Sequence, residues 1–144
     1  RGDIPKTRGV SVSGVLRMLS GTPYTIHDTN IDADRNGVLF DPLPAGTYSG
    51  TSQDSLQNVE YEGGRNGAYG PGFIQLDLRV GYRARLGPRR SLDVFGDLFN
   101  STNRANFTNP SGDRRNAADF LRLNGLVANS GLPRQFQLGV RLSF

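Results

Sequence analysis

The sequence predicts an all-β protein with about four long strands in an open antiparallel sheet. Two observations support this prediction: polar and apolar residues alternate along four separate segments, and the connections between the segments are alternately short and long. Successive side chains of a strand point to opposite faces of its sheet, so such alternation is typical of a strand with two different faces. On a helix, apolar residues at every second position would spread around the axis instead of forming one stripe.

The first two predicted strands cover residues 9–20 and 73–86. In the first, the apolar row consists of Val10, Val12, Gly14, Leu16 and Met18. Its opposite row contains Val15 and Leu19 beside two serines and Arg17, so the alternation is less regular there. In the second, one row is apolar throughout and consists of Ile74, Leu76, Leu78, Val80, Tyr82, Ala84 and Leu86. Its polar row consists of Gln75, Asp77, Arg79, Gly81, Arg83 and Arg85.

The last two predicted strands cover residues 91–100 and 134–144. The third strand has the apolar row Leu92, Val94, Gly96 and Leu98. Its opposite row places Phe95 and Phe99 among aspartates, which weakens the pattern. The fourth strand alternates almost perfectly, with an apolar row made of Phe136, Leu138, Val140, Leu142 and Phe144.

Periodicity alone fits a membrane barrel and a soluble antiparallel sheet about equally well, but the connection lengths favour the barrel. Residues 87–90 form a short turn, whereas the other connections run over residues 21–72 and 101–133. Bacterial barrels alternate short periplasmic turns with long extracellular loops, and soluble domains rarely contain two such long irregular connections. We therefore expect a transmembrane β-barrel fragment with long extracellular loops. The alternative is a soluble secreted β-sandwich binding module, for instance one that binds carbohydrate.

Four strands are too few to close a membrane barrel, for which the smallest examples need about eight. We therefore expect the remaining strands to lie before Arg1. The first residues lack the basic and then apolar order of a signal peptide, so an export signal is also expected upstream.

The composition argues against several other classes of protein. The 144 residues include 19 Gly and 8 Pro, and only 35% are hydrophobic, so a large compact core is hard to build. The absence of Cys excludes disulfides and thiolate metal sites. The net charge of +4 is modest and no aromatic platform accompanies the arginines, so we expect no nucleic-acid partner.

Several stretches resemble the TonB-dependent outer-membrane receptors, particularly those that begin with a carboxypeptidase-regulatory-like domain. The matching stretches are LSGTPYT at 19–25, FIQLDLR at 73–79, LDVFGDLFNSTN at 92–103, RANF at 104–107 and QLGVRLSF at 137–144. The resemblance implies that residues 1–144 are the C-terminal part of a plugged barrel of about 22 strands. Such a receptor lies in the outer membrane of a Gram-negative-type bacterium and imports a scarce ligand, such as a siderophore, cobalamin, an oligosaccharide or a peptide.

The same resemblance implies four kinds of partner. These are outer-membrane lipid, the remaining barrel strands and plug domain of the same protein, TonB through the missing N-terminal part, and an unknown imported ligand.

An acidic loop between residues 28 and 41 has two interpretations. Its Asp32-x-Asp34-x-Asn36-Gly37 pattern fits the opening of a calcium loop, in which alternate oxygen ligands converge on a hard cation. The twelfth position counted from Asp32 is Leu43 instead of the required Glu, which excludes an EF-hand. A looser calcium site would use Asp28, Asn30, Asp32, Asp34, Asn36 and Asp41. We favour the other interpretation, in which these residues cap turns, and we expect no other cofactor.

We expect no enzymatic activity and assign no catalytic residue. His27 is the only histidine, so a triad has only one imidazole base available, and the chain has no Gly-x-Ser-x-Gly element. His27 is therefore interpreted as a loop residue.

Overall fold

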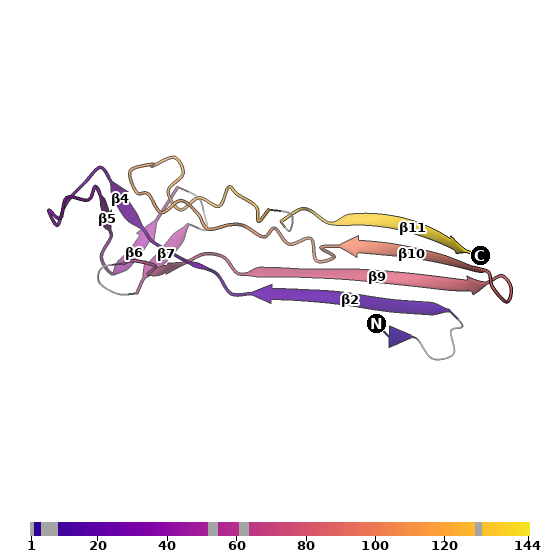
Figure 1. Ribbon diagram of the computed structural model, residues 1–144. Helices are drawn as coiled ribbons and strands as arrows, with labels where there is room; N and C mark the ends of the chain where they lie inside the picture. Colours follow the sequence, from indigo (N-terminus) through magenta and orange to yellow (C-terminus); the bar gives the residue numbers. More distant parts are fainter. Residues whose placement is uncertain (1, 4–8, 52–54, 61–63, 129–130) are drawn as a thin grey trace. The chain divides into compact units, whose positions relative to one another are not determined.

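The computed structural model describes residues 2–3, 9–51, 55–60, 64–128 and 131–144 (Figure 1). All regular secondary structure in these residues is β-strand, which confirms the all-β prediction. No helix in the described part of the chain is long and apolar enough to cross a membrane. The chain divides into two compact units, a sheet unit of Arg1–Met18, Ile74–Ala105 and Asn129–Phe144, and a loop unit of Leu19–Phe73 and Asn106–Ala128.

The sheet unit contains one open sheet with the strand order β1-β2-β9-β10-β11. Its members are β1 (Gly2–Asp3), β2 (Val10–Leu19), β9 (Phe73–Arg85), β10 (Ser91–Phe99) and β11 (Gln135–Ser143). The ends of the four long strands lie within one residue of those expected from the sequence. The edge strand β1 is an addition, because two residues are too short for periodicity to reveal.

The register of the sheet gathers the apolar rows on one face. Val94 of β10 pairs with Tyr82 of β9 and with Val140 of β11, and the polar residue Asp93 pairs with Arg83 and Arg141. The other apolar sets in register are Leu92 with Ala84 and Leu142, and Leu98 with Leu78 and Phe136. Since a shift by one residue would move every side chain to the other face, this register fixes the two-faced character of the sheet.

The neighbouring strand β2 follows the same division of its two rows. A Cβ atom built on Gly14 would lie 3.1 Å from the Leu78 side chain, which places this row of β2 on the apolar face. On the other face, the Arg17 guanidinium lies 3.6 Å from the Asp77 carboxylate. The apolar and polar faces therefore extend across all four long strands.

The apolar face of the sheet is bare. Val80, Leu138 and Val140 are 55%, 64% and 65% exposed, and Phe136 is 70% exposed. A β-sandwich would bury these side chains between two sheets packed about 10 Å apart. The exposed rows therefore favour the membrane sheet over the soluble sandwich, whose apolar rows would be covered by a second layer.

The described residues of the loop unit form three short antiparallel pairs instead of irregular chain. β3 (Pro23–Tyr24) pairs with β8 (Ala68–Tyr69), β4 (His27–Thr29) pairs with β5 (Phe40–Pro42), and β6 (Gly46–Ser49) pairs with β7 (Leu56–Val59). The described part of the chain has its hydrophobic core here, formed by Tyr24, Ile26, Leu43, Val59, Ala68, Phe120 and Leu121. The expectation of irregular long connections is corrected in this respect, since each connection contributes buried residues to a shared core.

Candidate functional site

The polar face of the sheet carries two ion pairs between β9 and β10. Arg79 binds Asp97 through two hydrogen bonds, and its Nη2 donates to Oδ2 at 2.7 Å. Arg83 binds Asp93 in the same way, with Nη2 donating to Oδ2 at 3.0 Å. Both pairs join residues that stand directly opposite each other in the register. The arginine side chains are about half exposed, so water screens each pair and its contribution to stability is small. Their main effect is to hold charged groups on this face.

Phe95 is an apolar residue in the middle of the polar row of β10, between Asp93 and Asp97. The Arg79 guanidinium stacks over it, with Cζ 4.6 Å from the ring centroid. Phe95 stands opposite Gly81 on one side and Gly139 on the other. A Cβ atom built on Gly139 would lie 2.3 Å from Phe95 Cζ, so the ring lies directly against the β11 backbone. Glycine is required here by the close approach of the ring.

A hollow of about 530 Å³ lies along the polar residues of the sheet unit. Its walls are formed by Gly9, Val10, Ser11, Ser13, Arg79, Gly81, Tyr82, Arg83, Asp93, Val94, Phe95 and Arg141. Because hydroxyl, guanidinium and carboxylate groups all border it, the hollow suits water and polar groups.

Asn100 joins the end of β10 to both ends of the connection that follows. Its Nδ2 donates to the carbonyl oxygens of Arg104 and Leu132, both at 2.9 Å. Its backbone N–H donates to Asp77 Oδ1 at 2.8 Å. Asn100 has a φ of 46°, which Asn tolerates better than most residues. Sequence reasoning assigned no role to Asn100, although an Asn at the end of a strand is a recognisable turn signal.

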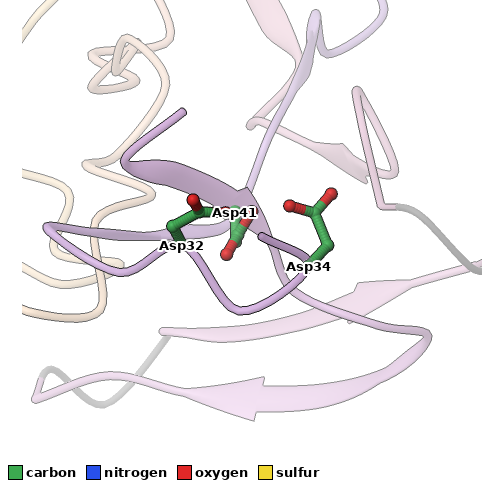
Figure 2. A group of neighbouring side chains, drawn as sticks. All are labelled: Asp32, Asp34 and Asp41. Carbon is green, nitrogen blue, oxygen red and sulfur yellow. The ribbon is translucent and has the colours of Figure 1, made fainter. Parts of the chain in front are cut away.

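The acidic loop brings three of the predicted metal ligands together (Figure 2). The carboxylates of Asp32, Asp34 and Asp41 each offer an oxygen, and these oxygens lie within 4.8 Å of one another. The oxygens also accept hydrogen bonds from the loop itself. Asp32 accepts from the N–H groups of Asn36 at 2.8 Å and Gly37 at 2.9 Å, and Asp41 accepts from the N–H of Ala33.

The remaining predicted ligands have other roles. Asn36 closes the turn, since its Oδ1 accepts from the Val38 N–H at 2.8 Å. Asn30 has a φ of 60°, and its N–H donates to the Leu39 carbonyl oxygen at 3.2 Å. Asp28 lies outside the cluster, because its carboxylate accepts two hydrogen bonds from Arg114, at 3.1 and 2.6 Å. That bond with Asp28 raises the pKa of the Arg114 guanidinium.

We expect the acidic loop to hold its shape without a metal ion, because its carboxylates are already occupied by N–H donors. Asp32→Ala removes the acceptor for two of these donors and should destabilise the loop locally by about 1 kcal/mol, as the loss of a capping side chain does. Amide exchange of residues 33–38 in the full-length protein measures this effect. Calcium or a chelator should leave the exchange of the unsubstituted protein unchanged.

Asp34→Ala is the matched control for that measurement. Its Oδ1 shares the Asn36 N–H at the longer distance of 3.2 Å and its Oδ2 accepts from the Asn36 side chain at 2.7 Å, so its loss leaves both backbone donors bonded to Asp32 and should matter less. If calcium slowed the amide exchange of residues 33–38 in the unsubstituted protein, but not in Asp32→Ala or in Asp41→Ala, the loop would instead be a metal site.

His27 is the first residue of β4 and pairs with Pro42 of β5, so its interpretation as a loop residue is corrected. Its ring stacks on Phe40 with centroids 4.0 Å apart, and its Nδ1 lies 3.2 Å from the Thr25 carbonyl oxygen.

The comparisons with known proteins agree with the geometry of the sheet. The model of the outer membrane beta barrel domain family matches residues 7–137. Comparison with curated proteins and with solved structures gave no match. The family match covers β2, β9 and β10, the residues of the loop unit and the first three residues of β11.

Proposed function

Because this chain belongs to the outer membrane β-barrel domain family and lies in the outer membrane, we propose that it forms the C-terminal part of the barrel of a TonB-dependent receptor. The bare apolar face of the sheet carries the membrane part of this proposal. An exposed apolar band of this extent is unusual for a soluble protein but suits contact with lipid. The resemblance of the motifs to TonB-dependent receptors supports the receptor class.

The lengths of the strands suit a membrane wall. A tilted strand crosses a bilayer with about 9–11 residues, and β2, β10 and β11 contain 10, 9 and 9. The face with Leu138 and Val140 then meets lipid, and the face with Arg79 and Arg83 meets the water-filled lumen. By the lengths of the connections, the short turn at 87–90 is assigned to the periplasmic side and the two long connections to the extracellular side.

The proposed function is uptake of a scarce ligand. Siderophores, cobalamin, oligosaccharides and peptides are the candidate classes, with TonB as the source of energy and the plug domain and remaining strands as intramolecular partners. The polar, ion-paired face of the sheet would form one section of the lumen wall. We propose no enzymatic activity and no nucleic-acid partner.

Uptake measurements in the source bacterium test this proposal. We expect deletion of the gene to abolish accumulation of one ligand class, tested with a ferric siderophore, cobalamin, oligosaccharides and peptides. Deletion of TonB should abolish the same accumulation, because import against a gradient needs energy from the inner membrane. The full-length gene returned on a plasmid serves as the control.

Uptake that requires this protein but continues without TonB would overturn the receptor class and leave a passive outer-membrane channel. The membrane assignment would then still hold, because it rests on the sheet and the family match.

A further inference from the structure

The two long connections of the chain are interleaved within the loop unit. The N–H of His27 in β4 donates to the Gly112 carbonyl oxygen at 2.9 Å, and the N–H of Arg114 donates to the His27 carbonyl oxygen at 2.9 Å. The Thr29 hydroxyl donates to Asp113 Oδ2 at 2.9 Å. Residues 112–114 therefore extend the β4–β5 pair from its β4 side, although more than eighty residues separate them from β4 in sequence.

A charged cluster reinforces this junction. The side chain of Asp28 is 7% exposed, and besides its two hydrogen bonds from Arg114 it lies 3.7 Å from the Arg115 guanidinium. Burial opposes ionisation of the neighbouring Asp113, but hydrogen bonds from the Arg115 N–H and the Thr29 hydroxyl hold the pKa of its carboxyl below the usual value. Asp28 of the first connection thus faces two arginines of the second, and Asp113 of the second accepts a hydrogen bond from Thr29 of the first.

The backbones of the two connections also touch, at glycines. A Cβ atom on Gly112 would lie 2.1 Å from the Thr25 carbonyl oxygen, and one on Gly50 would lie 2.1 Å from the Phe120 carbonyl oxygen. Each glycine belongs to one connection and its neighbour belongs to the other. Such close approach is possible only without a side chain.

The hydrophobic core of the loop unit also contains residues from both connections. Ile26 and Leu43 come from the first connection, and Phe120 and Leu121 come from the second. Ile26 is 0% exposed and Leu121 is 1% exposed. Removing either connection would therefore expose the apolar residues of the other.

We propose that the two connections form one cooperative unit that orders and opens as a whole, with Asp28, Arg114 and Arg115 as its clasp. Regions of a protein open in cooperative units where their contacts depend on one another, and every type of contact here crosses between the connections. A ligand or protein that binds one connection therefore stabilises the ordered state of both. This inference does not depend on the receptor class, because it uses contacts inside the loop unit alone.

Hydrogen exchange of the full-length protein in detergent or nanodiscs tests the clasp. Asp28→Asn removes both ion pairs at a side chain that is 7% exposed and turns an amide NH₂ group toward the arginine donors, so the hydrogen bonds across the junction are lost. We expect exchange to rise tenfold or more in residues 22–51 and also in residues 106–128. Asp34→Asn is the matched control, since this carboxylate is exposed and bonds only within its own turn, and it should leave residues 106–128 unchanged.

Gly112→Ala provides a second variant that leaves all charges in place. Its Cβ atom would press on the Thr25 carbonyl, so we again expect faster exchange in both connections. Amides of β9, β10 and β11 report whether the barrel itself is intact, and uptake reports separately on the receptor class. A rise confined to the substituted connection, or no rise in either variant, would overturn the proposal.

Discussion

Replacing Val140 with Arg is expected to destabilise the assembled full-length barrel by about 2 to 4 kcal/mol near the bilayer midplane, and by less toward the interface. Val140 is 65% exposed, and it shares its face with Val94 and Tyr82 through the register. An arginine at this position would have to enter hydrocarbon without a partner. The yield of heat-modifiable, assembled barrel in the outer membrane measures the effect.

Arg141→Gln is the matched control, one residue further along the same strand. Arg141 borders the hollow on the polar face, where water can hydrate either side chain. We therefore expect a far smaller loss of assembled barrel. Equal yields, or a worse defect for Arg141→Gln, would show that the two faces of β11 have been assigned the wrong way round.

Replacing Gly139 with Val is expected to destabilise the barrel by about 1 to 3 kcal/mol, the usual cost of forcing extra atoms into a packed contact. The new Cβ atom would stand 2.3 Å from Phe95 Cζ. The ring would have to swing away from the β11 backbone and out from under the Arg79 guanidinium. Thermal or denaturant unfolding of the purified full-length protein, followed by its mobility shift, gives the change in stability.

Two further variants make the Gly139 experiment specific to the ring. Gly87→Ala adds a methyl group where no atom lies within 4 Å, so it should have little effect. In a Phe95→Ala background the space above residue 139 is free, and Gly139→Val should cost much less than in the unsubstituted protein. If Gly139→Val destabilised the Phe95→Ala protein as much as the unsubstituted protein, the proposed contact between Phe95 and Gly139 would be disproved.

The strands could be predicted closely from the sequence because lipid and water impose different chemistry on alternate residues. The rows through Leu138 and Arg141 in β11 repeat this difference over the whole strand. β10 was harder to predict because Phe95 breaks its polar row. Only the structure shows that this ring is accommodated by Gly139 opposite it, and two residues on different strands leave no periodic trace.

The loop unit could not be predicted because its contacts are distant in sequence and follow no period. Asp28 was grouped with the acidic loop on account of its neighbours, yet its partner Arg114 lies 86 positions away. Asp32, Asp34 and Asp41 come together as expected because they belong to one short loop. Local patterns thus identified the acidic cluster, whereas the core around Ile26 and Leu121 required the tertiary structure.

The mixed origin of the loop unit affects which antibodies can bind it. At the junction of His27 and Gly112, residues from two separate stretches of chain lie side by side, and the neighbouring Arg114 and Arg115 are exposed. Epitopes there are discontinuous. Antibodies raised against a linear peptide from either stretch are therefore expected to bind the folded protein poorly, because the peptide alone does not adopt the folded structure. An immunogen or a grafted display scaffold built from this region has to carry both stretches together.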